Sequence, residues 1–280
     1  MTIFEAYQHT KKTLAAAGIE EYVTEAKHIL RHVTGMTNMQ ILTRYNEQLS
    51  PFAQNNLTAI LRQREIHYPL QYILGEWWFY GYPFAVGPGV LAPRADTECV
   101  VEKCLDFLKG KEAPRVLDLC AGSGCIGIAI AKECPQAEVL LVEKYPEAMR
   151  YSTQNIEKNG AENARALAGD VMEKTAANQC FDLIVSNPPY VAAGEKEIMS
   201  PETEFEPETA FFGGEDGLDF YRAILAGYAG SLAPGGMLIF EVGAKQSAAV
   251  TDLMRKAGFS DIGTKEDLNG IERAVFATSK

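Results

Sequence analysis

A glycine-rich stretch at residues 116–127 decides the fold. It reads Val-Leu-Asp-Leu-Cys-Ala-Gly-Ser-Gly-Cys-Ile-Gly, so an apolar run passes through a turn of small residues into a second apolar run. This order predicts a buried strand, a tight turn and a helix. Glycines let the backbone approach a bound nucleotide closely, and the N–H groups at the start of the helix donate hydrogen bonds to negative groups. We therefore expect a ligand at this turn.

The chain around this turn alternates between strand-like and helix-like segments. We predict strands over 115–119, 138–142, 164–168, 181–185, 236–241 and 272–277, and helices over 97–108, after 123, from 146, over 217–229 and over 246–257. This alternation is typical of a parallel sheet with helices on both faces. The sequence thus predicts a doubly wound α/β domain.

The first 70 residues follow a different pattern. Apolar residues recur at helical spacing in two stretches that end at Gly18 and Gly35. Ser50-Pro51 then supplies an N-cap and a first-turn proline for a further helix. The aromatic and β-branched residues that follow, up to Leu91, indicate a β-hairpin. We therefore divide the chain into a small helical bundle (1–70), a hairpin linker (71–95) and a catalytic α/β domain (96–280).

Composition and charge indicate a globular protein whose partner is not mainly nucleic acid. The chain has 280 residues, of which 47% are hydrophobic and 22% charged, as in a globular protein with a packed core. Its net charge is -11, and residues 76–280 hold 31 of the 37 acidic side chains but only 19 of the 26 Lys and Arg. This balance argues against a protein whose affinity comes mainly from nucleic-acid phosphates.

Cysteines, histidines and apolar runs give further expectations. The 6 cysteines contain no Cys-x-x-Cys pair, and no apolar run is long enough to span a membrane. We expect reduced thiols and a cytoplasmic protein without a signal peptide. None of the 4 histidines is grouped with other residues at the spacing of metal ligands, so no metal is expected. We also expect a monomer.

Three carboxylates are placed to hold a ligand at the glycine turn. The turn satisfies Gly-x-Gly-x-x-Gly, which alone leaves dinucleotides and adenosyl ligands open. Asp118, at the end of the strand, would repel a pyrophosphate but attract a cationic amino-acid group. Glu143 ends the next strand, where a carboxylate can bind ribose hydroxyls. Asp170 follows the third strand. Its carboxylate could accept a hydrogen bond from the adenine amine, or it could only cap a loop. Together these residues favour S-adenosylmethionine over NAD.

A second motif, Asn187-Pro188-Pro189-Tyr190, follows the next predicted strand and therefore shares the rim of the sheet with the glycine turn. The prolines remove backbone donors, so the Pro188 carbonyl and the Asn187 side-chain oxygen can both accept hydrogen bonds. This pair suits a planar NH2 group, against which Tyr190 could lay its ring. A purely structural turn is the alternative.

The glycine turn, Glu143, Asp170 and the Asn-Pro-Pro-Tyr motif together resemble a class I amino methyltransferase that acts on a planar nitrogen. Further segments resemble the release-factor glutamine N5-methyltransferases, namely Pro-Leu-Gln-Tyr-Ile-Leu-Gly (69–75), Leu-Ala-Pro-Arg-Ala-Asp-Thr-Glu (91–98), Glu-Pro (206–207), Gly-Gly-Glu-Asp-Gly-Leu-Asp (213–219) and Glu-Val-Gly (241–243) with Gln246. The resemblance runs from about residue 69 to the end of the chain. Ala92, Ala95 and Val242 depart from the family pattern, at positions not expected to carry chemistry.

This resemblance implies a Rossmann-like, mostly parallel sheet of seven strands and an enzyme of translation termination. The enzyme would transfer a methyl group from S-adenosylmethionine to the side-chain amide nitrogen (N5) of the glutamine in the Gly-Gly-Gln loop of class 1 peptide chain release factors. S-adenosylhomocysteine would be the second product, and the N-terminal bundle would dock the release factor.

The resemblance also assigns residues to roles. The catalytic residues would be Asn187, Pro188 and Tyr190. The residues that bind the cofactor would be Thr97, Asp118, Ala121, Gly122, Ser123, Gly124, Gly127, Glu143, Asp170 and Asn187. The residues that bind the substrate would be Leu91, Arg94, Asn187, Pro188, Pro189 and Tyr190.

The sequence leaves other functions open. Adenine also presents a planar NH2 group, so a DNA adenine N6-methyltransferase is an alternative, although a base-flipping enzyme should show a basic face. A non-catalytic adaptor that binds release factors and S-adenosylmethionine is another. The acidic stretch 195–208 could meet a basic patch on a protein substrate or be a solvated loop.

Overall fold

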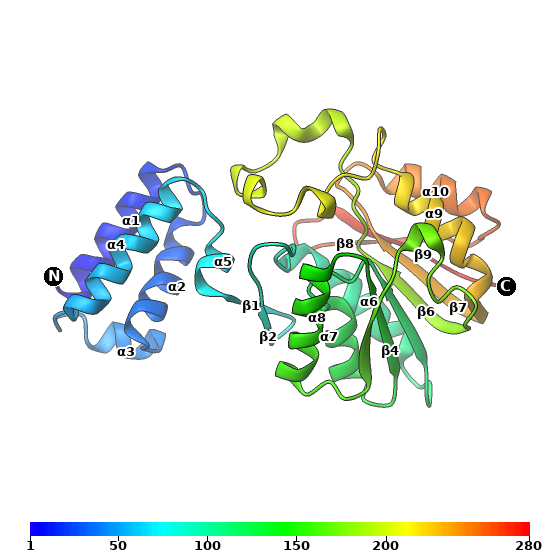
Figure 1. The fold of residues 1–280 in the computed structure, drawn as a ribbon, viewed down its shortest axis with the longest axis horizontal. Helices are drawn as coiled ribbons and strands as arrows, with labels where there is room; N and C mark the ends of the chain where they lie inside the picture. The colour runs from blue at the N-terminus through cyan, green and yellow to red at the C-terminus, as the bar shows by residue number, and fades with distance from the viewer. The chain divides into compact units, whose positions relative to one another are not determined.

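The computed structural model describes all 280 residues except the side chains of residues 196–198. The chain falls into two compact units (Figure 1). The first comprises residues 1–75 together with 200–205, and the second comprises 76–199 and 206–280. The return of a six-residue segment to the first unit has no signal in the local sequence pattern.

The first unit is a helical bundle. Its helices are α1 (Ile3–Ala16), α2 (Tyr22–Thr34), α3 (Asn38–Thr43), α4 (Pro51–Glu65) and α5 (Leu70–Leu74), and residues 200–205 add the 3-10 helix η4 (Pro201–Phe205). The expected N-cap is confirmed, because the Ser50 side chain accepts the backbone N–H of Ala53. The short helices α3 and α5 were not predicted, because neither is long enough to show a full apolar period.

A buried arginine organises this unit. The Arg64 side chain is fully buried, and its Nε and Nη2 donate to the two carboxylate oxygens of Glu25, each at 2.8 Å. Its Nη2 also donates to Glu202 at 2.6 Å, and its Nη1 to the Tyr68 carbonyl at 2.6 Å. Burial raises the pKa of Glu25, and the opposing charge and hydrogen bond of Arg64 act against that rise. The segment 200–205 is thereby tied to the bundle through Glu202.

The second unit begins with the expected β-hairpin. Strands β1 (Glu76–Phe79) and β2 (Tyr82–Ala85) pair in antiparallel register around a two-residue turn. Both turn residues, Tyr80 and Gly81, have positive φ angles, as this kind of tight hairpin requires. Asn155 fixes the end of the hairpin, because its side chain exchanges two hydrogen bonds with the backbone of Ala85 and donates a third to the Ser123 carbonyl. The hairpin is thus joined to the glycine turn.

The sheet has seven strands in the order β5-β4-β3-β6-β7-β9-β8 (Figure 1). They are β3 (Arg115–Leu119), β4 (Glu138–Glu143), β5 (Ala164–Ala168), β6 (Phe181–Ser186), β7 (Leu232–Glu241), β8 (Gly263–Glu266) and β9 (Glu272–Thr278). The first five in this order are parallel, and β9 runs antiparallel to both β7 and β8. The expected α/β class and mostly parallel sheet are confirmed. Of the seven strands, only β8 was not predicted from the sequence. It is an edge strand that reads Gly-Thr-Lys-Glu and has no alternation of apolar residues.

Helices cover both faces of the sheet. The helices are α6 (Glu98–Leu108), α7 (Cys125–Glu133), α8 (Pro146–Asn159), α9 (Asp219–Tyr228) and α10 (Ser247–Lys256), with short 3-10 turns η1 (Ala95–Thr97), η2 (Val171–Glu173), η3 (Ala193–Ile198), η5 (Glu208–Ala210) and η6 (Ala229–Ser231). One apolar cluster packs α6, α7 and α8 against one face, and a second packs α9 and α10 against the other. Because both faces are buried, β3, β4 and β6 are apolar almost throughout. Polar side chains at their ends therefore stand out as site candidates.

No helix in the described part of the chain combines the length and the apolar character needed to cross a membrane.

Candidate active site

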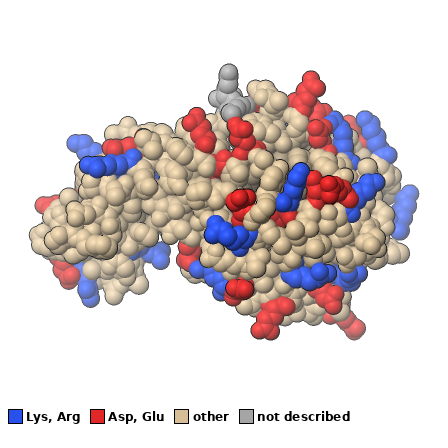
Figure 2. Space-filling view, viewed as in Figure 1, with Lys and Arg blue, Asp and Glu red and all other residues tan. Residues whose placement is uncertain are grey.

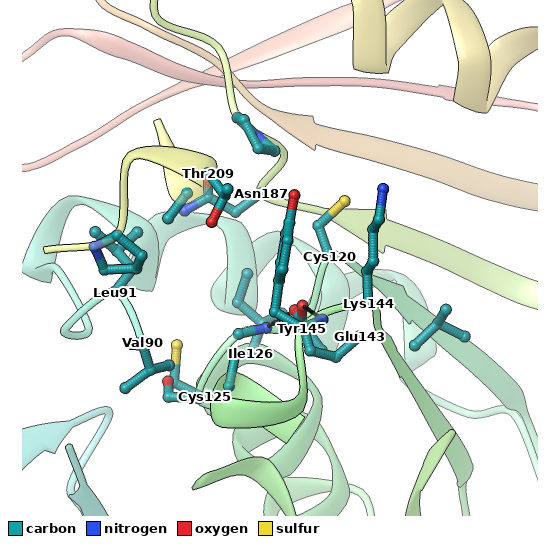
Figure 3. Close-up of a pocket in the computed structure, with 18 of the residues that line it drawn as sticks. Val90, Leu91, Cys120, Cys125, Ile126, Glu143, Lys144, Tyr145, Asn187 and Thr209 are labelled. Atoms are coloured by element: carbon teal, nitrogen blue, oxygen red, sulfur yellow. Dashed lines mark hydrogen bonds between the residues drawn. The ribbon is translucent and has the colours of Figure 1, made fainter. Parts of the chain in front are cut away.

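A cavity lies in the second unit, where the parallel strands end. The glycine turn after β3, residues 142–145 at the end of β4, residues 169–171 after β5 and Asn187 after β6 all contribute to its lining. In Figure 3, Leu91 and Thr209 lie on one side of the cavity and Lys144 on the other, with Asn187 between them. This is the position at which open α/β sheets bind their ligands.

Asp118 supports the glycine turn from beneath. Its side chain is buried, and its Oδ2 accepts the backbone N–H of Gly127 at 2.9 Å. A Cβ on Gly127 would come within 2.9 Å of that same oxygen, so the close approach requires glycine. The other oxygen, Oδ1, has no hydrogen-bond partner. Burial raises the pKa of Asp118 to about 7, the Gly127 hydrogen bond acts against this rise and the charge of Glu143 adds to it.

The turn also contains a strained residue. Cys120, directly after β3, lines the cavity and has a φ of 59°, a conformation that side-chain-bearing residues rarely adopt. Backbone strain of this kind is concentrated at functional sites, where the surrounding structure holds it. Burial raises the pKa of the Cys120 thiol, so this side chain is a neutral part of the wall.

Glu143 connects the end of β4 to the glycine turn. Its Oε2 accepts the backbone N–H of Gly122 at 2.8 Å, and its Oε1 accepts that of Tyr145 at 2.8 Å. A carboxylate offers about four acceptor positions, so two remain for hydroxyl groups of a ligand. The side chain is buried and lines the cavity.

Asp170 both caps a 3-10 turn and lines the cavity. Its Oδ1 accepts the Met172 backbone N–H at 2.8 Å as the N-cap of η2, so the cap that the sequence left open as an alternative is present. Its Oδ2 lies 2.8 Å from Lys144 Nζ. Burial opposes ionisation of this carboxyl, but the Lys144 and Met172 hydrogen bonds hold its pKa below the ordinary value. Asp170 is therefore an ionised acceptor at the cavity wall.

A buried carboxylate, that of Glu241, lies next to Asn187 and Thr97. Both line the cavity, whereas Glu241, at the end of β7, is 3% exposed and lies outside the lining. Burial raises the pKa of Glu241 to about 7, while hydrogen bonding with the side chains of Thr97 and Asn187 and the charge of Arg273 act against that rise.

Two further segments line the cavity and form its rim. Residues 89–94 and the segment containing Pro207, Thr209 and Ala210 both line the cavity. Glu206 joins them, because one oxygen accepts the Ala92 backbone N–H at 3.0 Å and the other forms an ion pair with Arg94. Of the acidic stretch 195–208, Glu202 and Glu206 are thus paired within the protein, whereas the side chain of Glu197 lies outside the described residues.

Most of the residues predicted to form the site meet at this cavity. Those that line it are Leu91, Arg94, Thr97, Ala121, Gly122, Ser123, Glu143, Asp170, Asn187 and Pro189. The structure places five others outside the lining, namely Asp118, Gly124, Gly127, Pro188 and Tyr190. Tyr190 packs against the apolar cluster of α9 and α10, and burial raises its pKa. Its carbonyl accepts Gln246 Nε2 at 2.7 Å.

Sequence reasoning missed several lining residues. Lys144 and Tyr145 line the cavity directly after Glu143, so their position next to a predicted ligand residue was an available signal. Phe220, on α9, had no such signal, because only the packing of that helix brings it to the cavity. The described residues contain no group of three or more His, Cys, Asp or Glu side chains that could hold a metal ion.

Two family models match the chain. The family model of the PrmC N-terminal domain matches residues 5–75, and that of the methyltransferase small domain matches residues 98–203.

Curated relatives match nearly the whole chain. A protein named release factor glutamine methyltransferase from Geobacter sulfurreducens is 39% identical over 275 residues, which are 98% of this chain and 95% of that protein. One of the same name from Bordetella pertussis is 38% identical over 263 residues, 94% of this chain and 96% of the relative.

Solved structures share the fold. A 16S rRNA N2 methyltransferase from T. thermophilus, in complex with AdoMet and guanosine, matches with a TM-score of 0.54 at 24% identity. The match covers 73% of this chain and 50% of that protein's chain. The hMettl16 catalytic domain has a TM-score of 0.59 at 14% identity, with 81% and 82% covered. These likenesses concern the fold alone.

Proposed function

The chain belongs to the release factor glutamine methyltransferase family, and we propose that it transfers a methyl group from S-adenosylmethionine to N5 of the glutamine in the Gly-Gly-Gln motif of class 1 peptide chain release factors. The observation that carries this proposal is the identity of 39% along 98% of the chain with a curated member of the family. The cavity adds chemical support, because Asn187 and the glycine turn contribute to one lining.

The residues at the cavity fit S-adenosylmethionine. Asp118 lies outside the cavity lining, where its Oδ2 accepts the Gly127 N–H and holds the glycine turn in place for a ligand. Glu143 has acceptor positions left for ribose hydroxyls, and the ionised Asp170 can accept from an adenine amine. When bound, S-adenosylmethionine supplies an electrophilic methyl group on a positively charged sulfur.

The amide of glutamine needs help to act as a nucleophile. Its nitrogen lone pair is delocalised into the carbonyl by the resonance that also makes the peptide bond planar. In the proposed mechanism, the Asn187 side-chain oxygen and the Pro188 carbonyl accept the two amide hydrogens. They orient the nitrogen and stabilise the positive charge that develops on it during transfer. No strong base is needed, because the N-methylated, N-protonated amide loses its proton readily to water.

Position accounts for much of the rate in such a reaction. An in-line displacement needs the nitrogen about 3–3.5 Å from the methyl carbon before attack. We propose that the rim residues Leu91 and Arg94 enclose the glutamine side chain and that Tyr190 supports the Asn187-Pro188 turn. The N-terminal bundle, residues 1–70, would dock the body of the release factor to a monomeric enzyme.

Charge favours a protein substrate over DNA. On the face shown in Figure 2, acidic and basic side chains are interspersed and form no continuous basic band. Residues 76–280 carry 31 acidic and 19 basic side chains. A DNA adenine methyltransferase must instead hold a phosphate backbone while it flips its base.

The test is a mass spectrum of an unmethylated release factor after incubation with this protein and S-adenosylmethionine. We expect one added methyl group, located by fragmentation on the glutamine of the Gly-Gly-Gln motif, and none on a release factor in which that glutamine is replaced by alanine. A methyl group on another residue, or none despite cofactor binding, would contradict the proposal.

A further inference from the structure

Glu241 lies beside Asn187 because of the strand register. Strands β6 and β7 are parallel, and Ser186 pairs with Phe240. Asn187, directly after β6, therefore lies next to Glu241, the last residue of β7, at the rim where the cavity opens. The Glu241 backbone is fixed in place, since its carbonyl accepts the Tyr221 hydroxyl at 2.8 Å and its strand position pairs with Ala274 of β9.

The carboxylate of Glu241 has few polar neighbours. The side chains of Thr97 and Asn187 act as hydrogen-bonding neighbours that oppose the rise in its pKa, while its Oε2 is buried without a partner. Arg273 contributes a favourable charge but forms its ion pairs with Asp96 and Asp267, each at 3.0 Å. A buried carboxylate with so few partners is costly, which calls for a functional reason.

The hydrogen-bonding capacity of these groups determines their orientation. An ionised carboxylate only accepts hydrogen bonds, whereas the Asn side chain has a donor end and an acceptor end. While Glu241 is ionised, Asn187 must therefore direct its NH2 group to Glu241, which leaves its Oδ1 for other donors. The Thr97 hydroxyl likewise donates its hydrogen to Glu241 and keeps its lone pairs.

We propose that Glu241 is a positioning residue, which orients Asn187 so that its side-chain oxygen, beside the Pro188 carbonyl, faces the NH2 group of the substrate. This inference rests on the proposed function and deepens it. It gives the selectivity a physical basis, because a wall of acceptors favours the amide of glutamine and disfavours the carboxylate of glutamate.

Protonation of Glu241 would remove this orientation, because a carboxylic acid can donate to Asn187 Oδ1 and compete with the substrate. Its pKa of about 7 predicts a kcat that falls as the pH drops from 8 to 6 at saturating S-adenosylmethionine. The charged and titratable groups facing it are Arg273 and Asp96, together with the neutral Tyr190, Tyr221, Cys99 and Cys125.

Two substitutions and a control test the proposal. Glu241→Leu removes the acceptor but retains most of the volume, and we expect kcat to fall roughly 100-fold, as for loss of one oriented polar group in an active site. KM for the release factor and the affinity for S-adenosylmethionine should stay within about twofold. Glu241→Gln keeps one oxygen for the Asn187 amide but cannot titrate, so we expect a loss of about tenfold in kcat and a flat profile between pH 6 and 8. Glu266→Leu, exposed on β8 of the same sheet, should behave as wild type.

The outcomes separate the two proposals. A wild-type protein that does not methylate the release factor would overturn both. An active wild type with an equally active Glu241→Leu variant would overturn only the role of Glu241, as would an acidic limb that persists in Glu241→Gln. If Glu241→Leu fails to fold, the pH profile of Glu241→Gln decides alone.

Discussion

The Glu143 carboxylate accepts the backbone N–H of Gly122 at 2.8 Å, so the end of β4 holds the glycine turn that follows β3. The same carboxylate accepts the Tyr145 N–H at 2.8 Å through its other oxygen. One side chain thereby fixes two walls of the cavity before any ligand binds. Preorganisation of this kind lowers the conformational cost of binding.

Replacing Glu143 should weaken cofactor binding more than catalysis. Hydrogen bonds to a charged group contribute about 1.5–3 kcal/mol, so Glu143→Ala should lower the affinity for S-adenosylmethionine by roughly 10- to 150-fold. Titration calorimetry measures this. Glu138→Ala, at the exposed opposite end of the same strand, is the matched control and should leave the affinity unchanged. An equal loss in both variants would mean that the strand, not the carboxylate, is responsible.

Replacing Asn187 should affect the chemical step. We expect Asn187→Ala to lower kcat by about 100-fold or more, because an oriented acceptor is lost where charge develops. The affinity for S-adenosylmethionine should remain nearly that of the wild type in calorimetry, since the carboxylates assigned to the cofactor are intact. If this variant lost cofactor binding as well, the division between cofactor and substrate residues would be wrong.

The buried Asp118 should make stability depend on pH. Its pKa of about 7 in the folded protein lies above the ordinary value of 3.8. The folded state therefore binds this proton more tightly than the unfolded state, and the group's contribution to stability is lost as the pH rises through 7. Asp118→Asn cannot ionise and keeps an oxygen for the Gly127 N–H.

The advantage of Asp118→Asn over wild type should be small near pH 4, grow with pH and level off above 7. Its size follows about 1.4 kcal/mol per pKa unit, so a few kcal/mol are expected. Urea unfolding followed by tryptophan fluorescence reports on this unit, because Trp77 and Trp78 both lie in β1. A difference that does not vary with pH would contradict the pKa assignment.

Removing Arg64 should destabilise the helical unit. Loss of one partner of a buried ion pair typically costs about 3–5 kcal/mol, because the other charge stays buried alone. In Arg64→Ala, Glu25 would be that charge. Hydrogen exchange by mass spectrometry should show faster opening of α2 and α4. Arg62→Ala, exposed on the same helix, is the control and should exchange as the wild type does.

The sequence by itself determined the elements that depend on local order. Residues 116–127 form the predicted strand, turn and helix, because apolar runs interrupted by small residues have few other conformations. Asn187 follows a strand, so its place at the rim could also be predicted. Glu143 and Asp170 were placed by the same reasoning and line the cavity.

Only the tertiary structure decided which distant residues meet. The Asp118 side chain supports the turn from beneath instead of lining the cavity, because it bonds Gly127 across the turn. Glu241 reaches Asn187 because β7 is placed next to β6, and Glu202 reaches Arg64 although 138 positions separate them. The geometry of helices and strands sets the spacing of apolar residues, so these elements can be predicted from a short stretch of sequence. Strand order and the burial of charged side chains depend on how the whole chain packs, and a short stretch carries no information about that.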